Sequence, residues 1–167
     1  MAVEIVDMKN IFFYETSIGR IGIIDNDEAI TGLLFADDAS IAVEGACMNE
    51  TALIKQAAAQ LMEYLAGKRR KFEIPLAFEG TAFQRKVWES LVRIPYGETR
   101  SYREIAESIG QPKACRAVGM ANNKNPVAVI VPCHRVIGAN GKLVGYAGGL
   151  GIKQKLLELE KEYKNRY

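Results

Sequence analysis

The sequence predicts an α+β protein, in which an antiparallel sheet with one helix precedes a mostly helical second half. Strand-like segments near the N-terminus, capped helical segments later in the chain and an uneven charge distribution support this prediction. Residues 1–78 contain 7 Lys/Arg and 12 Asp/Glu, a net charge of −5, whereas residues 79–167 contain 15 Lys/Arg and 8 Glu, a net charge of +7. We therefore expect an N-terminal α/β domain over residues 1–78 and a C-terminal domain over residues 79–167.

Three segments of the first half have strand character. Residues 11–16, 21–24 and 29–35 are rich in β-branched and aromatic side chains, and glycines or polar turns separate them. This pattern predicts an antiparallel meander. The residues that follow, 36–47, are compatible with a loop or a short strand.

A helix is expected next, because apolar residues recur at three- and four-residue intervals over residues 49–66. Asn49 is a candidate N-cap, and Gly67 a candidate stop. The basic run at residues 68–71 suggests a solvated turn, and residues 72–78 return to strand character. No catalytic constellation is visible in the first half.

Two capping boxes predict helix starts in the second half. Thr81 is followed three residues later by Gln84, and Ser101 by Glu104. At this spacing the two side chains satisfy each other's backbone amides. Gly110 then fits the position just beyond the end of the second helix.

A further helix is expected over residues 113–122, joined to the preceding one across residues 110–112. Such a pair suggests a helix-turn-helix. Its second helix is rich in small residues and would present Lys113 and Arg116 to a DNA groove. A packed helix pair with ordinary solvated charges is the alternative. The last helix is expected over residues 150–164.

Cys133 and His134 form the most informative pair in the chain. They follow an apolar run at residues 127–131, which suggests a strand that stops at Pro132 and delivers the thiol to a sheet edge. His134 is the only histidine. A thiol beside an imidazole suggests thiolate chemistry, because the thiolate is the nucleophile. A buried structural cysteine beside a core histidine is the alternative.

Composition excludes several classes of protein. The three cysteines, Cys47, Cys115 and Cys133, are odd in number and scattered, which argues against a disulfide framework. One histidine leaves too few soft ligands for an ordinary zinc site, so we expect no metal. No apolar run is long enough to span a membrane, and the N-terminus carries acids rather than the positive charge of a signal peptide. We expect a cytoplasmic protein, or a nuclear one in a eukaryote.

A series of short motifs runs through the second half. In order, they are Phe83-Gln84-x-x-Val87-Trp88, Ile94-Pro95-Tyr96-Gly97-Glu98-Thr99, Ser101-Tyr102-x-x-Ile105-Ala106, Arg116-Ala117-Val118-Gly119, Asn125-Pro126, Pro132-Cys133-His134-Arg135-Val136 and Gly145-Tyr146-x-Gly148-Gly149-Leu150. With these motifs the second half resembles the 6-O-alkylguanine-DNA alkyltransferases, also called methylated-DNA–protein-cysteine methyltransferases. The first half is similar only in its strand–helix pattern. The resemblance implies a ribonuclease H-like small domain followed by a winged helix-turn-helix-like, DNA-binding alkyltransferase domain.

The resemblance also implies an activity, DNA repair by direct damage reversal. The protein would flip 6-O-alkylguanine out of double-stranded DNA and transfer the alkyl group irreversibly to Cys133, as a monomer without a cofactor, one turnover per molecule. His134 and Glu160 would activate the thiol, usually through a water. A water fits the local geometry, because neighbouring side chains on an extended chain point to opposite faces.

Other residues receive roles from the resemblance. Tyr102 would rotate the target phosphate and support protonation of the leaving guanine, and Arg116 would enter the duplex where the damaged base leaves. Ala147 stands where some members carry serine, so a hydroxyl is absent there. The expected DNA-contacting residues are Arg116, Lys113, Ala114, Ala117, Tyr102 and Arg135. The expected pocket residues are Asn125, which braces the site, Val131, Tyr146 and Ala147.

Three alternatives are weaker. Alkyltransferase-like sensors share this domain but replace the acceptor cysteine, whereas Cys133 is present here. A plain helix-turn-helix regulator would not need Cys133, His134 and Glu160. Cysteine hydrolases generally place the histidine far from the cysteine in sequence, whereas here the two are adjacent.

Overall fold

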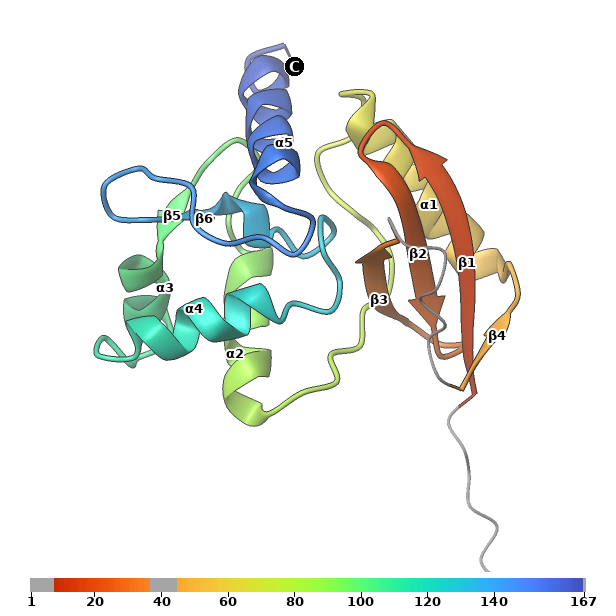
Figure 1. Ribbon diagram of the computed structural model, residues 1–167, viewed down its shortest axis with the longest axis horizontal. Helices are drawn as coiled ribbons and strands as arrows, with labels where there is room; N and C mark the ends of the chain where they lie inside the picture. Colours follow the sequence, from red (N-terminus) through yellow and green to blue (C-terminus); the bar gives the residue numbers. More distant parts are fainter. Residues whose placement is uncertain (1–7, 37–44, 167) are drawn as a thin grey trace, which may run out of the picture.

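A four-stranded sheet covered by one helix forms the first half of the computed structural model, which describes residues 8–36 and 45–166 (Figure 1). The strand order is β3-β2-β1-β4. The first three strands form the predicted antiparallel meander, and β4 pairs parallel to β1. The elements are β1 (Lys9–Thr16), β2 (Gly19–Asp25), β3 (Ile30–Phe35), β4 (Ala46–Met48) and α1 (Ala52–Leu65).

Two details of the first half differ from the predictions. Helix α1 is capped by Thr51, whose hydroxyl accepts the Ile54 amide, and not by Asn49. Gly67 does follow the end of the helix, with a φ of 76°. Residues 72–78 do not form the predicted strand beyond one isolated bridge, in which their backbone runs beside Ile30 on the edge strand β3. Of the segment 36–47, residues 37–44 lie outside the described part of the chain.

The second half is mostly helical, and both predicted capping boxes are present. Gly110 follows α3 with a φ of 75°, as expected. Helix α4 begins two residues later than predicted, so Lys113 lies in the preceding turn and Ala114 is the N-cap. The elements are α2 (Ala82–Val92), β5 (Arg100–Ser101), α3 (Tyr102–Ser108), α4 (Cys115–Asn123), the 3₁₀ helix η1 (Cys133–Arg135), β6 (Val136–Ile137) and α5 (Leu150–Tyr163).

The apolar run at residues 127–131 is a compact turn and not the predicted strand. Val131 N–H bonds to the Val127 carbonyl at 2.9 Å, and Val129 has a φ of 69°, unusual for a β-branched residue. The turn nevertheless docks on the sheet, because Leu33 N–H in β3 donates to the Pro126 carbonyl at 2.8 Å. The run is apolar because it fills the space between the two halves.

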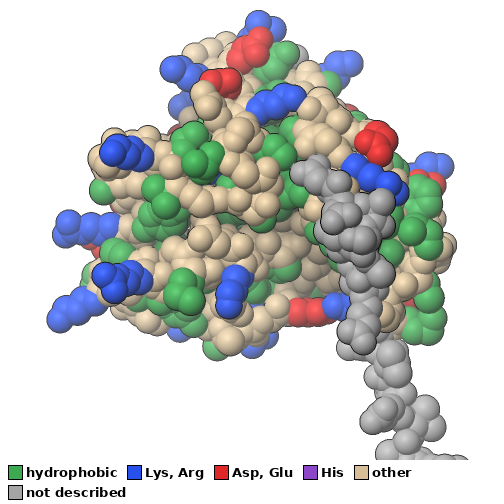
Figure 2. All heavy atoms as spheres, in the orientation of Figure 1, with side chains coloured by type: hydrophobic (Ala, Val, Ile, Leu, Met, Phe, Trp, Pro, Cys, Tyr) green, Lys and Arg blue, Asp and Glu red, His purple; other side chains and the backbone are tan. Residues whose placement is uncertain are grey.

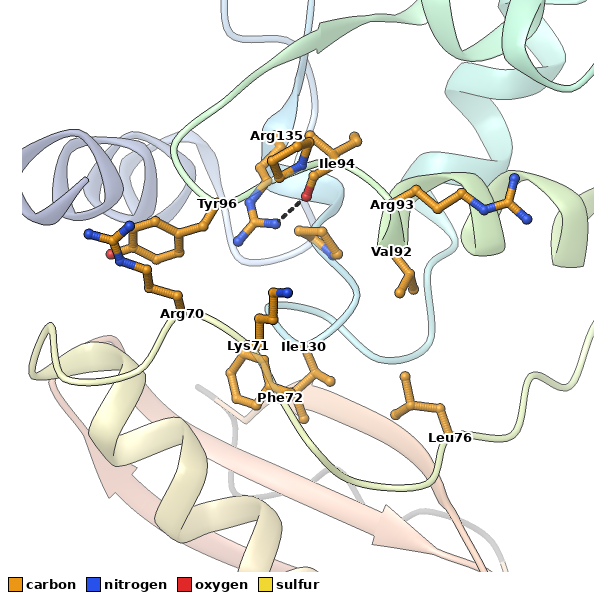
Figure 3. Close-up of a pocket in the computed structure, with 12 residues that line it drawn as sticks. Arg70, Lys71, Phe72, Leu76, Val92, Arg93, Ile94, Tyr96, Ile130 and Arg135 are labelled. Carbon is orange, nitrogen blue, oxygen red and sulfur yellow. Dashed lines mark hydrogen bonds between the residues drawn. The ribbon is translucent and has the colours of Figure 1, made fainter. Parts of the chain in front are cut away.

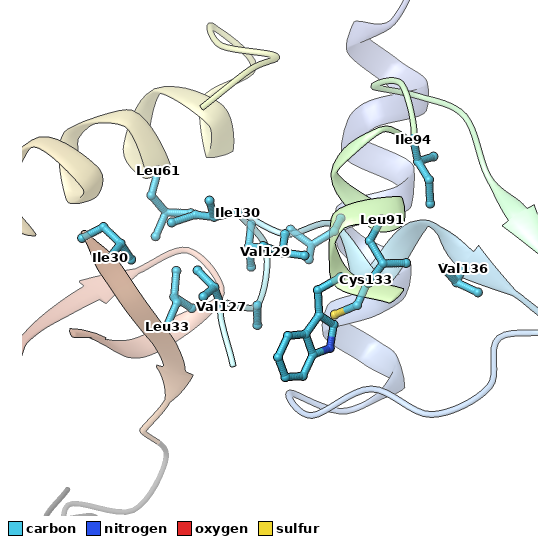
Figure 4. Close-up of a cluster of buried hydrophobic side chains, with 14 of the residues drawn as sticks. Ile30, Leu33, Leu61, Leu91, Ile94, Val127, Val129, Ile130, Cys133 and Val136 are labelled. Carbon is cyan, nitrogen blue, oxygen red and sulfur yellow. The ribbon is translucent and has the colours of Figure 1, made fainter. Parts of the chain in front are cut away.

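One hydrophobic cluster joins the halves (Figure 4). Ile30, Leu33 and Leu61 from the first half meet Val127 and Ile130 from the second. Burying these side chains against each other favours one fixed arrangement of the halves. No helix among residues 8–36 and 45–166 is long and apolar enough to cross a membrane.

Candidate active site

Cys133 is the first residue of η1, and only 4% of its surface is exposed. Burial raises the pKa of the Cys133 thiol to about 11, although a hydrogen bond from Asn125 and the charge of Lys153 lower it in part. The resting thiol is therefore protonated at neutral pH. Thiolate chemistry at this residue requires a base that removes the proton.

His134 is fully buried and lies 2.6 Å from Glu160, measured from Nε2 to Oε2. Burial lowers the pKa of His134, against the hydrogen bond and charge of Glu160, which raise it. The carboxylate at this distance requires a proton on Nε2. Nδ1 is buried and has no hydrogen-bond partner within the described part of the chain. A neutral His134 therefore has its acceptor lone pair on Nδ1.

Glu160 on α5 is held by a dense set of donors. Burial alone would raise the pKa of Glu160, but the hydrogen bond and charge of His134, followed by Arg135, lower it to about 2. Gly97 N–H donates to Oε1 at 2.9 Å, and the Tyr64 hydroxyl donates to Oε2 at 2.5 Å. The carboxylate is thus ionised and fixed in orientation.

Arg135 is one of these donors and lies in the interior. Its Nε donates to Glu160 Oε1 at 2.8 Å, and its Nη1 to the Ile94 carbonyl at 2.6 Å. The residue is only 7% exposed. This placement contradicts the expectation that Arg135 contacts DNA, because both ends of the guanidinium are committed to buried acceptors.

Tyr64 and Lys153 belong to the site, but sequence reasoning missed both. Lys153 is fully buried, and its Nζ donates to the carbonyls of Val136 at 2.6 Å and Val144 at 2.9 Å. A signal existed for Lys153, which shares one face of α5 with Leu156 and Glu160 at helical spacing. Tyr64 carries no such signal, because it occupies an ordinary apolar position of α1.

Three of the four expected pocket residues, Asn125, Val131 and Tyr146, interact with Cys133. Asn125 braces the turn, since its amide donates to the Val131 carbonyl at 2.8 Å and its oxygen accepts the Val127 amide at 3.0 Å. Tyr146 packs edge-on against Phe35, and burial, followed by the charge of Cys133, raises the pKa of its hydroxyl. Val131 is buried, whereas Ala147 is exposed.

Most of the expected DNA-contacting residues lie on the exposed side of α3 and α4. Arg116, Ala117 and Lys113 are exposed, and Ala114 is partly so. The Tyr102 hydroxyl donates to the Val144 carbonyl at 3.0 Å. Figure 2 shows Lys and Arg side chains along this edge of the helical half, with few Asp or Glu among them.

A cavity of about 590 Å³ lies between the halves (Figure 3). Pro132 and Arg135 line it, but Cys133 does not. Arg70, from the basic run predicted as a solvated turn, stacks on Tyr96 and also donates to carbonyls near the end of α5. Part of that run is therefore structural.

Comparison with known proteins agrees with this architecture. The family described as "6-O-methylguanine DNA methyltransferase" matches twice, by its ribonuclease-like domain at residues 12–78 and by its DNA binding domain at residues 82–162. A methylated-DNA--protein-cysteine methyltransferase of Methanosarcina acetivorans is 51% identical over 148 residues, which cover 88% of this chain and 95% of that protein. The chain belongs to the 6-O-methylguanine DNA methyltransferase family.

Solved structures confirm the fold that is expected of this family of methyl-transferring enzymes. The crystal structure of Mycobacterium tuberculosis OGT in complex with DNA is 45% identical, with a TM-score of 0.84 over 92% of this chain and 94% of that one. An O6-methylguanine DNA methyltransferase from Methanococcus jannaschii is 26% identical, with a TM-score of 0.65 over 89% and 92%. The predicted α+β fold class is therefore correct.

Proposed function

We propose that this protein repairs DNA by transferring an alkyl group from O6 of guanine to Sγ of Cys133. One observation supports the proposal most directly. A buried thiol is followed by a buried imidazole whose Nε2 donates to Glu160 and whose Nδ1 is left as an acceptor. Such a cysteine–histidine–carboxylate series can activate a nucleophile.

The first step is removal of the thiol proton. At neutral pH a thiol with a pKa of about 11 is ionised in only about one molecule in ten thousand, a cost of about 5 kcal/mol. His134 Nδ1 takes this proton through a water, and Glu160 stabilises the resulting imidazolium. The charge of Lys153 further favours the thiolate.

The second step is alkyl transfer. The thiolate attacks the alkyl carbon, an S–C bond forms as the C–O6 bond breaks, and the electron pair returns to the guanine. Tyr102 supports protonation of the leaving base. The product is a thioether, and no group in the mechanism cleaves it, so each molecule reacts once.

The lesion must leave the base stack before transfer, which costs a few kcal/mol. Arg116 occupies the gap, and Lys113 with the start of α4 contacts phosphates, so binding has little sequence preference and weakens with salt.

The division at residue 78 separates a supporting domain from this DNA-binding domain. The family matches, which end at residue 78 and resume at residue 82, support that boundary.

The test is the intact mass of the protein after mixing with duplex DNA that carries one 6-O-methylguanine. We expect a gain of one methyl group per protein, which stops at one even with excess DNA. Cys133→Ala abolishes the gain, whereas the matched variants Cys47→Ala and Cys115→Ala retain it. Tight binding of the lesion without any mass gain would instead identify a damage sensor and overturn the catalytic roles.

A further inference from the structure

Tyr64 connects the N-terminal half to the candidate proton relay. It lies on α1 and is fully buried, and its hydroxyl is 2.5 Å from Glu160 Oε2 and 3.3 Å from His134 Nε2. A side chain from the first half thus contacts both the carboxylate and the imidazole.

The direction of the Tyr64 hydroxyl follows from counting protons. Glu160 is ionised, so the short contact between Oε2 and His134 Nε2 needs the proton on Nε2. Nε2 then cannot accept from Tyr64, and the hydroxyl must donate to Oε2. Arg135 Nη2 also donates to Oε2, at 3.1 Å, so three donors share this one carboxylate oxygen, and each weakens the negative charge available to the others.

We infer that Tyr64 is a positioning residue of the relay, whose hydroxyl competes with His134 for Glu160 Oε2 and thereby keeps the imidazole neutral and ready to accept a proton. This inference rests on the proposed function, in which His134 Nδ1 receives the proton of Cys133. The N-terminal half thus acts on the reaction through Glu160.

Contacts around Tyr64 fix its hydroxyl in place. A Cβ added at Gly67 would lie 2.6 Å from the ring of Tyr163 on α5, so the end of α1 approaches α5 closely. Arg70 donates to the carbonyls of Tyr163 at 2.9 Å and Lys164 at 2.8 Å. The Tyr64 ring packs against Phe72 and Tyr96, which a phenylalanine at position 64 would preserve.

Several other ionisable groups contribute to the electrostatic potential at His134 and Glu160, and the Tyr64→Phe substitution leaves all of them in place. They come from the segment after α2, from η1, from the loop before α5 and from α5 itself. They are Tyr96, Cys133, Arg135, Tyr146 and Lys153.

The test uses the fact that His134 is the only histidine in the chain. Its ring signals in a nitrogen-15 NMR titration of the untagged protein are therefore unambiguous and need no activity. In Tyr64→Phe we expect the midpoint to move to higher pH, because Oε2 loses one of its three donors and stabilises the imidazolium more strongly. The matched control is Tyr96→Phe, which removes a neighbouring buried hydroxyl that has no hydrogen-bond partner among the described residues and therefore moves the midpoint much less than Tyr64→Phe does.

The rate of methyl transfer gives a second readout. The acid limb of its pH profile moves to higher pH in Tyr64→Phe. The rate on that limb therefore falls about tenfold for each pH unit by which the midpoint rises, with a smaller change at high pH. Identical titration curves in the wild type and Tyr64→Phe, including no titration in either, would overturn the inference. A wild type that transfers no methyl group refutes the proposed function, and the NMR result still decides the role of Tyr64.

Discussion

Arg135 and Glu160 form a two-point ion pair inside the protein. Arg135 Nε lies 2.8 Å from Oε1 and Nη2 lies 3.1 Å from Oε2, while both side chains are less than a tenth exposed. The planar guanidinium matches the carboxylate and fixes its orientation, so that Oε2 is presented to His134. Removing one partner of such a buried pair typically costs about 3–5 kcal/mol, because the other charge stays behind unpaired.

The first prediction separates this structural role from DNA binding. Arg135→Lys keeps the charge but loses the two-point geometry, so we expect the free energy of unfolding to fall by about 2 kcal/mol. Affinity for an undamaged duplex should change less than about twofold, since the side chain is buried. Lys113→Ala should do the opposite, leaving stability unchanged and reducing the salt slope of binding by about one unit. Chemical denaturation and binding at several salt concentrations measure both.

The second prediction concerns base flipping. Arg116 is exposed on α4 and is available to fill the gap left by a flipped base. Arg116→Ala should slow methyl transfer from duplex DNA by about 10- to 100-fold, because flipping costs a few kcal/mol. Transfer from a single-stranded oligonucleotide should slow much less. Equal slowing on the two substrates would contradict the role of Arg116 in the duplex.

The third prediction tests the packing of α1 on α5. Gly67 and Gly110 both have φ near 75°, but a Cβ at Gly67 would meet the Tyr163 ring whereas one at Gly110 meets nothing within 4 Å. Gly110→Ala should cost about 1 kcal/mol for the backbone alone. Gly67→Ala should cost about 1–3 kcal/mol more, because Tyr163 must move. Equal losses in a denaturation series would show that the two helices do not meet as described.

The fourth prediction concerns acid stability. The pKa of Glu160 is lowered to about 2, so the unfolded chain takes up its proton at higher pH than the folded protein. The stabilisation from Glu160 is therefore full above its ordinary pKa near 4.5 and is lost as the pH falls toward 2. It amounts to about 3 kcal/mol at most. His134, whose pKa is also lowered, adds a loss of the same sign that begins near pH 6.5.

Denaturation curves between pH 7 and pH 3 measure this dependence. Glu160→Gln should be less stable than the wild type at pH 7, and its stability should fall less steeply with acid. The control is Glu158→Gln on the exposed side of the same helix, which should keep the wild-type slope. A wild-type slope in Glu160→Gln would refute the assignment.

Local sequence rules predicted the elements whose determinants are themselves local. The capping boxes at Thr81 and Ser101 were predicted correctly, because cap and partner lie within one turn. The antiparallel meander and the end of the first helix at Gly67 were also predicted correctly, because turns and stops are marked by neighbouring residues. Residues 127–131 were predicted wrongly as a strand, because an apolar run specifies burial but not the partner that buries it.

The sequence by itself determined the fold class and, through its motifs, the family resemblance and the candidate nucleophile Cys133. Only the tertiary structure decided which side chains surround that residue. It moved Arg135 from the expected DNA surface into a pair with Glu160, and it brought Tyr64 to the same carboxylate from 96 residues away. The physical reason is that a buried carboxylate must be satisfied by whichever donors packing brings within reach, and that packing joins segments far apart in the chain.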